Sequence, residues 1–254
     1  MHPELRTAFN ADFTSDKYEA LLCCVNKTEK WPADFRISET PVFRDALTRS
    51  ERVKVPMLEV FRSHFGTLVR GTMISLATFV LFYLMTVFAL SWGTTALGFS
   101  REQFLIIQLF GILFFALGIP AGALLAERGR RRTLIWVTIG IGLFGLVMAP
   151  LFVAGTVGAI LTMAVGLSLM GLTYGPLGTV LSELFPTSIR YTGSSLTFNL
   201  AGIFGASLAP YAATWLATHH GLPYVGYYLA ASALVTLVAL LSLPSAPTRT
   251  HGDL

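Results

Sequence analysis

Six long apolar stretches fill the chain from about residue 68 to residue 243 and leave little room for any other kind of fold. A helix rises about 1.5 Å per residue, so about 20 apolar residues cross the roughly 30 Å core of a bilayer. The pattern therefore predicts an all-α membrane protein with six transmembrane helices. The expected spans lie at about 68–92, 103–126, 133–154, 157–182, 191–217 and 223–243.

Basic residues lie almost entirely on one side of these spans. Ten precede residue 68, and Arg70 lies at the start of the first span. Four arginines lie between spans two and three, Arg190 lies between spans four and five, and Arg249 lies in the tail. Only Arg101 falls on the opposite side. Because Lys and Arg in short loops stay in the cytoplasm, we expect both termini there and a multi-pass protein of the plasma (inner) membrane.

The rest of the composition argues against several other classes of protein. The net charge is +4, but the basic residues flank apolar spans, where they meet lipid headgroups rather than nucleic acid. Cys23 and Cys24 are adjacent and lack metal-ligand spacing, so we expect free thiols and no metal. The spans hold no Ser/His dyad or paired aspartates, and the chain has no nucleotide-binding Gly-x-x-x-x-Gly-Lys motif. We therefore expect neither an enzyme nor a cofactor.

Outside the spans, the chain divides into polar segments. Residues 1–35 are polar, without enough apolar periodicity for a core. Residues 36–67 are expected to form a cytoplasmic segment, with an amphipathic helix at the interface near residues 58–67. Residues 68–243 form the predicted bundle, and residues 244–254 a cytoplasmic tail.

Few polar side chains interrupt the spans, and these are the candidates for a substrate cavity. Polar groups within a bilayer usually face the bundle interior, where they bond between helices or line a cavity. Both roles are open for every candidate, although the size of Tyr83 and Gln108 favours the cavity. The five candidates are Tyr83, Thr86, Gln108, Tyr174 and Asn199.

Small residues predict where the helices approach closely. Span two contains Gly118 and Gly122, and span four contains Gly171 and Gly175, each pair at Gly-x-x-x-Gly spacing. Pro176 predicts a kink in span four, which serves either packing or gating. Span five carries a stripe of small residues at helical spacing: Ser195, Asn199, Gly202, Ala206 and Ala209.

Two loops on the predicted cytoplasmic side carry distinctive charged motifs. The first loop, between spans two and three, reads Gly122-Ala-Leu-Leu-Ala-Glu127-Arg128-Gly129-Arg130-Arg131-Arg132. The second loop, between spans four and five, reads Glu183-Leu-Phe-Pro186-Thr-Ser-Ile-Arg190. In this second loop, Pro186 stops the helix that ends near Glu183, and Arg190 follows.

Together these loops resemble the major facilitator superfamily, and in particular its metabolite:proton symporter family. The first is similar to the family's Gly-x-x-x-Asp-Arg-x-Gly-Arg-Arg loop, and the second to its Glu-Leu-Phe-Pro-Thr-x-x-Arg loop. Residues Arg36–Phe43 and Pro56–Phe61 are similar to its central loop. The resemblance covers about residues 36–245 and implies the C-terminal half of a twelve-helix transporter. Residues 1–35 do not resemble the end of a first half.

The resemblance implies an inner gate built from charges and helix ends, with one departure. The family's Asp falls on Ala126 and its Arg on Glu127, so the acidic group is displaced by about 100° around the helix. An alternative is that the loop arginines only fix the topology. The candidates for the gate are Gly122, Glu127, Gly129, Arg130, Arg131, Glu183 and Arg190.

The resemblance further implies secondary active transport of a small organic metabolite, coupled to protons, by alternating access. Substrate would lie between two halves near the bilayer midplane. The second half would be a separate N-terminal chain or a second copy of this one. The alternative is a truncated, non-transporting membrane remnant or an interaction subunit. The lack of a carboxylate, lysine or histidine deep in any span favours this alternative, because proton-coupled transporters normally need such a group.

Overall fold

The structure is a computed structural model that describes residues 56–243, a range made of helices and their connections. The predicted segments 1–35 and 244–254 lie outside the described residues, as do Cys23 and Cys24. Most of the predicted segment 36–67 lies outside them too. The amphipathic helix predicted near residues 58–67 begins and ends earlier, as α4 (Pro56–Ser63).

Six helices in the described range are long and apolar enough to cross a membrane, which confirms the predicted all-α membrane fold. Four of them run without interruption: α7 (Arg101–Glu127), α8 (Arg130–Phe152), α9 (Gly155–Glu183) and α12 (Leu222–Leu241). The first consists of α5 (Phe65–Tyr83), the π-helical turn η2 (Leu84–Phe88) and α6 (Ala89–Thr95). The fifth consists of α10 (Arg190–Ile203), the π-helical turn η3 (Phe204–Leu208) and α11 (Ala209–His219).

Short connections with recognisable end signals separate the helices. Before α7, the Ser100 hydroxyl accepts from the Gln103 backbone N–H at 3.1 Å, and the Gln103 side chain accepts from the Ser100 N–H at 3.2 Å. This reciprocal capping box satisfies donors that a helix N-terminus otherwise leaves free. Between α7 and α8, Gly129 adopts a φ of 138°, which a residue with a side chain rarely adopts. The tight turn of the first charged loop therefore depends on this glycine.

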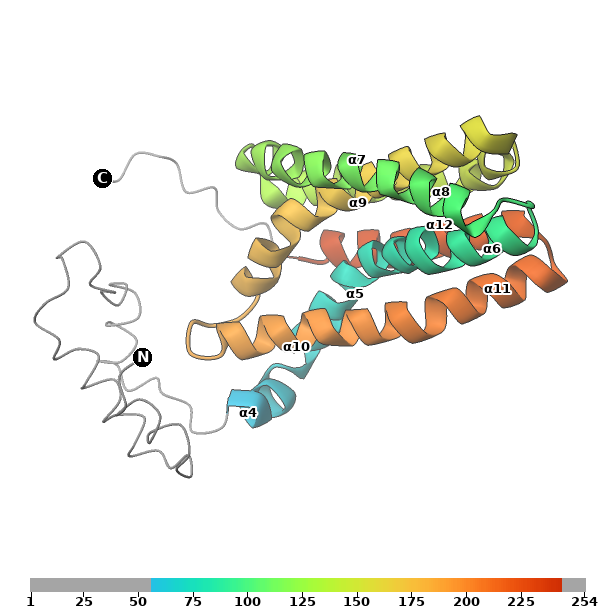
Figure 1. Cartoon of the computed structure of the whole chain (residues 1–254). Helices are drawn as coiled ribbons and strands as arrows, with labels where there is room; N and C mark the ends of the chain where they lie inside the picture. The colour runs from blue at the N-terminus through green and yellow to red at the C-terminus, as the bar shows by residue number, and fades with distance from the viewer. Residues whose placement is uncertain (1–55, 244–254) are drawn as a thin grey trace, which may run out of the picture. The chain divides into compact units, whose positions relative to one another are not determined.

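The first membrane helix lies at the centre of the bundle (Figure 1). In this view, α5 and α6 run between α7 and α9 on one side and α10 and α11 on the other. The starts of α5, α8 and α10 and the ends of α7, α9 and α12 share one end of the bundle. We call it the arginine-rich end, because every described arginine except Arg101 lies there.

The predicted glycines of spans two and four face each other between α7 and α9. A Cβ built at Gly122 would lie 2.4 Å from the Leu172 carbonyl oxygen. A Cβ at Gly171 would lie 2.4 Å from the Phe115 oxygen, and one at Gly175 2.7 Å from the Ile119 oxygen. A Cβ built at Gly118 would lie 3.0 Å from the Gly171 Cα, so Gly118 belongs to the same contact. The backbones therefore touch along this seam, and α9 continues as one helix through Pro176.

A second glycine contact, which the sequence analysis missed, joins α8 to α12. A Cβ at Gly226 would lie 2.0 Å from the Gly145 carbonyl oxygen. A Cβ at Gly145 would in turn lie 2.7 Å from the Gly226 oxygen. Neither glycine has a partner at Gly-x-x-x-Gly spacing in its own span, so that spacing indicates neither of them. Close approach in a membrane bundle needs only one small residue per helix.

Span five packs through a different face from the predicted stripe. Ser195, Asn199 and Ala206 are exposed and Gly202 is only partly buried, so Ala209 alone of the stripe is fully buried. Small residues occur on both faces of this helix, and the buried set follows a strict four-residue spacing. The sequence pattern could not decide between them, because the choice depends on the neighbouring α5, where a Cβ built at Gly205 would lie 2.7 Å from the Phe79 Cβ. The buried face consists of Gly193, Thr197, Ala201, Gly205, Ala209, Ala213 and Ala217.

Candidate functional site: charged loops and a polar face

One ion pair joins the two charged loops at the arginine-rich end. Arg130 starts α8 and Glu183 ends α9, and the Arg130 guanidinium pairs with the Glu183 carboxylate. Both side chains are about half exposed, at 50% and 53%. An ion pair so exposed to water contributes up to about 1 kcal/mol. The contact is therefore specific in geometry and weak in energy, so that breaking it costs little.

The neighbouring Arg131 holds a different helix. Its Nε donates to the Leu240 carbonyl oxygen at 3.0 Å, and its Nη2 donates to the Leu241 oxygen at 3.0 Å. These are carbonyls at the end of α12, where a helix has unpaired acceptors and partial negative charge. The cation therefore caps α12 and attaches it to the start of α8.

The remaining gate candidates are placed apart from this pair. Arg190 donates from Nε to the Phe185 carbonyl oxygen at 3.4 Å, a contact within its own loop. Glu127 is exposed at the end of α7 and forms no ion pair with any residue in the range 56–243. Glu183, rather than Glu127, is the acidic partner of Arg130. The structure thus brings Arg130 and Glu183 together, and Gly122 and Gly129 shape the helix packing and the turn around them.

The short helix α4 packs on the second charged loop. Val60 of α4 is fully buried in a small cluster with Leu68, Phe185 and Ile189. Phe185 and Ile189 flank the middle of the loop that begins at Glu183. The segment that enters the bundle from the N-terminal side is therefore in apolar contact with this loop.

Gln108 lies between α7 and the π-helical turn of the first span. Its Nε2 donates to the Met85 carbonyl oxygen at 3.1 Å and to the Thr86 oxygen at 2.9 Å. The side chain is only 9% exposed. A π turn changes the register of backbone hydrogen bonding, so its carbonyls need other donors. Both of the amide's N–H groups are used here, which favours a structural role over contact with a substrate.

The other four polar candidates remain at least partly exposed. Tyr83 and Thr86 are half-buried in the first span, and Tyr174 is 36% exposed in α9. Asn199 of α10 is exposed, and its Nδ2 donates to the Ser195 carbonyl oxygen at 2.8 Å. Polar groups from three spans are therefore available on the surface of this bundle.

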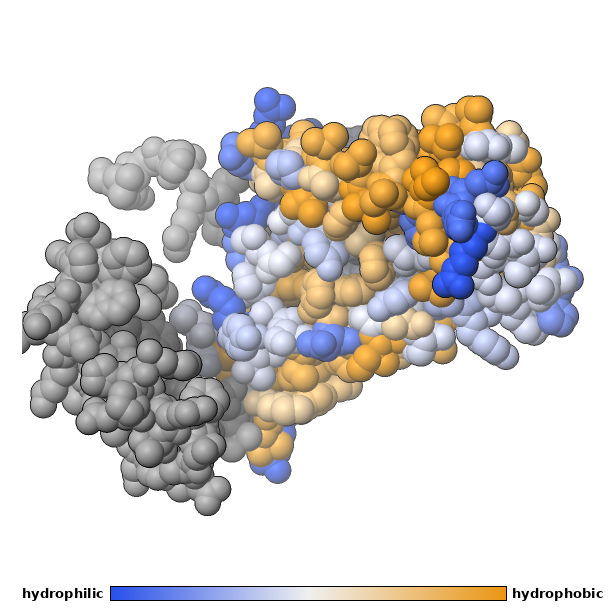
Figure 2. Space-filling view, viewed as in Figure 1, coloured by the Kyte–Doolittle hydropathy of each residue, from blue (hydrophilic) through white to orange (hydrophobic). Residues whose placement is uncertain are grey.

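One face of the bundle differs from the rest of the surface. Figure 2 shows a hydrophobic region that follows α7 and, below it, a paler and more hydrophilic region over α5, α6 and part of α10. Two aromatic rings pack against Tyr174. The centroid of its ring lies 5.8 Å from that of Phe115 and 6.1 Å from that of Phe198. Phe198 in turn meets Phe79 edge-on at 4.8 Å. By contrast, the exposed side chains along the membrane part of α7 are almost all apolar.

Comparison with known proteins agrees with this arrangement of loops and spans. Residues 44–252 match the family described as "Sugar (and other) transporter". The chain belongs to this transporter family of the major facilitator superfamily. The match confirms the resemblance inferred from the two charged loops. Members of this family and the relatives found are transporters rather than enzymes.

Several curated relatives in the family are similar over most of this chain. The inner membrane metabolite transport protein YhjE of Escherichia coli (strain K12) is 44% identical over 214 residues, which cover 81% of this chain and 48% of that protein. A putative metabolite transport protein of Haemophilus influenzae is 39% identical, covering 81% and 49%. The shikimate transporter of Escherichia coli (strain K12) is 29% identical, covering 74% and 44%. The chain thus spans about half the length of the curated relatives it matches.

Proposed function

We propose that this chain is the C-terminal six-helix half of a secondary transporter for small organic metabolites. Its membership of the transporter family, its six apolar helices and its metabolite-transporting relatives support this function. We place it in the plasma (inner) membrane with both termini in the cytoplasm, since the arginine-rich end should stay on that side. Substrate would bind between this half and a second half, either a separate N-terminal chain or a second copy.

The Arg130–Glu183 ion pair is the main support for a gating mechanism. It connects the start of α8 to the end of α9, and its weak, half-exposed geometry suits a contact that forms and breaks in each cycle. Arg131 attaches α12 to α8, so these two helices would move together. Alternating access would then separate the end of α9 from the α8–α12 pair when the cytoplasmic side opens.

We assign the substrate face to Tyr83, Thr86, Tyr174 and Asn199. Their hydroxyl and amide groups can donate and accept hydrogen bonds, as recognition of a small polar metabolite requires. The deep parts of the six spans contain no carboxylate, lysine or histidine. If transport is coupled to protons, the titratable group would therefore come from a separate N-terminal half, because a second copy of this chain would lack one too.

Uptake into lipid vesicles tests this proposal. The chain is reconstituted alone, and also together with the N-terminal half of the Escherichia coli metabolite transport protein YhjE. An inward proton gradient is imposed, and uptake of shikimate, citrate, proline and betaine is measured, because these are the compounds in the names of the relatives. We expect at least one compound to accumulate above empty vesicles. Arg130→Glu should abolish uptake, and Arg130→Glu with Glu183→Arg should restore part of it.

Arg128→Gln is the matched control, because Arg128 lies in the same loop and has no partner among residues 56–243. It should transport like the native chain. If neither the chain alone nor the paired halves take up any compound, although circular dichroism shows folded helices, the proposal fails. The protein would then be the non-transporting remnant or interaction subunit.

A further inference from the structure

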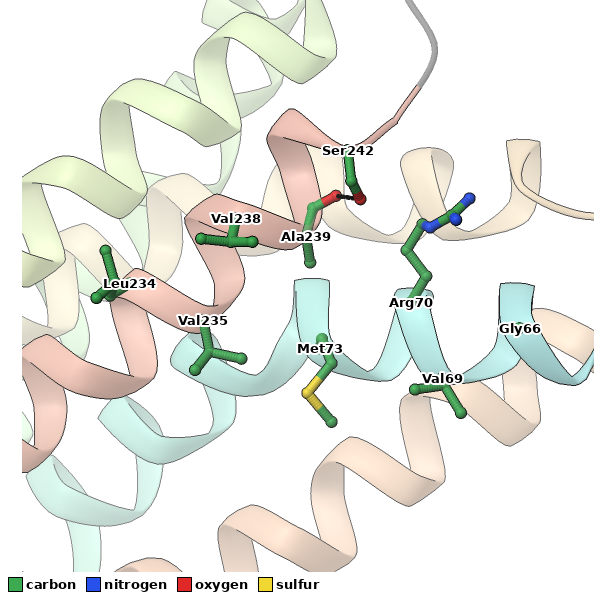
Figure 3. Close-up of a pocket in the computed structure, with 9 residues that line it drawn as sticks. All are labelled: Gly66, Val69, Arg70, Met73, Leu234, Val235, Val238, Ala239 and Ser242. Carbon is green, nitrogen blue, oxygen red and sulfur yellow. Dashed lines mark hydrogen bonds between the residues drawn. The ribbon is translucent and has the colours of Figure 1, made fainter.

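A groove lies between the first and last membrane helices at the arginine-rich end. It has a volume of about 470 Å³ and is formed by α5 and α12 alone (Figure 3). From α5 it is lined by Gly66, Val69, Arg70 and Met73, and from α12 by Leu234, Val235, Val238, Ala239 and Ser242. None of the residues of the charged ion pair or of the polar face takes part, so this is a separate site.

A single threonine joins the two helices that form the groove. The Thr236 hydroxyl donates to the Met73 carbonyl oxygen at 2.7 Å and accepts from the Ala77 backbone N–H at 3.1 Å. It thereby inserts into a backbone turn of α5 and holds α12 against it. Toward the arginine-rich end the two helices present small residues, and a Cβ built at Gly66 would meet no atom within 4 Å. The groove is therefore open space between two helices that are joined at Thr236.

The walls of this groove suit a hydrocarbon chain. Val69, Leu234, Val235 and Val238 are between 40% and 62% exposed, although they belong to helices that cross the membrane. The one polar group on the α12 side, the Ser242 hydroxyl, already donates to the Ala239 carbonyl oxygen at 2.8 Å. An apolar surface at this depth contacts lipid tails, and a groove in it holds one tail more closely than a flat surface does.

Arg70 supplies a charge at the mouth of the groove. In Figure 3 its side chain extends from α5 on the side where Ser242 follows the end of α12. It is exposed and has no hydrogen-bond or ion-pair partner in the part of the chain that the structure describes. Arg70 lies five residues into α5, so its long side chain can reach the headgroup region while its carbons stay in apolar surroundings. A phosphate is the group that a guanidinium binds best at this level.

We propose that this groove binds one phospholipid with an anionic headgroup. One acyl chain lies along the groove between α5 and α12, and the headgroup phosphate pairs with Arg70. The lipid would cover the cytoplasmic ends of the first and sixth spans. This site does not depend on which metabolite the protein transports, or on whether it transports one.

Native mass spectrometry of the full chain in detergent tests the lipid site. The protein is titrated separately with dioleoyl phosphatidylglycerol and dioleoyl phosphatidylcholine, which share acyl chains and differ in net charge. We expect the first phosphatidylglycerol to bind about five-fold more tightly, as about 1 kcal/mol per basic residue near an anionic surface implies. Glycerol phosphate, which has no acyl chain, should not displace it.

Variants separate the two features of the site. Arg70→Gln should remove the preference for phosphatidylglycerol, and Arg70→Lys should retain most of it. A Cβ built at Gly66 meets no atom within 4 Å, so Gly66→Leu should place its side chain in the groove and weaken binding of both lipids. Arg128→Gln, which changes an arginine of the loop between α7 and α8, should leave both affinities unchanged. Equal binding of the two lipids by the native chain, or a preference that survives Arg70→Gln, would overturn the proposal.

Discussion

Arg130 and Arg131 are adjacent in the chain but hold different helices. Arg130 pairs with a half-exposed carboxylate on α9, whereas Arg131 donates to two backbone oxygens at the end of α12. An exposed ion pair is opposed by the hydration of both charges. The contact with the Leu240 oxygen is partly buried, so water competes less for it, whereas the contact with the Leu241 oxygen is exposed. The helix dipole adds to the attraction of a cation at both. At the scale of single residues, Arg131 should therefore matter for stability and Arg130 for gating.

We expect Arg131→Gln to lower the free energy of unfolding by about 1–2 kcal/mol, because it leaves the α12 carbonyls without a charged donor. Arg130→Gln should lower it by less than about 1 kcal/mol. Unfolding of both variants and the native chain by sodium dodecyl sulfate in mixed micelles, followed by circular dichroism, measures the difference. A larger loss for Arg130→Gln than for Arg131→Gln would contradict this assignment of roles.

At the scale of elements, the π-helical turn η2 explains why Gln108 is buried. The turn occupies Leu84–Phe88 of the first span, and the Gln108 amide donates to two of its carbonyls. Hydropathy predicts a single helix through this region, and nothing in its composition indicates a π turn. The sequence therefore identified Gln108 as an unusual polar residue, but its partner could be found only once the backbone of the neighbouring helix was known.

Gln108→Leu should leave those two carbonyls without side-chain donors and destabilise the bundle by about 1–3 kcal/mol. Amide hydrogen exchange should accelerate in the first span around η2 more than in α9. Thr86→Val is the matched control, since the Thr86 hydroxyl donates only to Phe82 of its own helix, at 2.7 Å. Its effect on unfolding should be much smaller. If the two variants behave alike, Gln108 does not hold the π turn.

The whole molecule shows where sequence patterns are sufficient and where they are not. Long apolar stretches predicted six membrane helices, because lipid imposes the same length and composition on every span. They did not predict which face of span five is buried, since Asn199 and Thr197 lie on opposite sides of a helix with small residues on both. Nor could they choose among three consecutive arginines for Glu183, because that depends on where the turn at Gly129 directs each side chain.

Two exposed faces of the bundle should differ in the solvent that they meet. Asn199 on α10 and Leu109 on α7 are both exposed, and they lie nine and eight residues from the starts of their helices. The α7 face is apolar and suits lipid, whereas the face with Asn199 should line an aqueous path between two halves. Thiols ionise and react with polar reagents only where water reaches them.

Single cysteines at these two positions test this difference in a chain with Cys23→Ser and Cys24→Ser. In bilayer vesicles, a water-soluble, charged maleimide should label Asn199→Cys at least ten-fold faster than Leu109→Cys. In detergent with a denaturant, both should react at similar rates, which controls for the reactivity of each thiol. If a second half or a second copy covers the polar face, its addition should slow labelling at residue 199 and leave residue 109 unchanged. Equal rates in the bilayer would mean that both faces contact lipid, and the polar face would then not be a transport path.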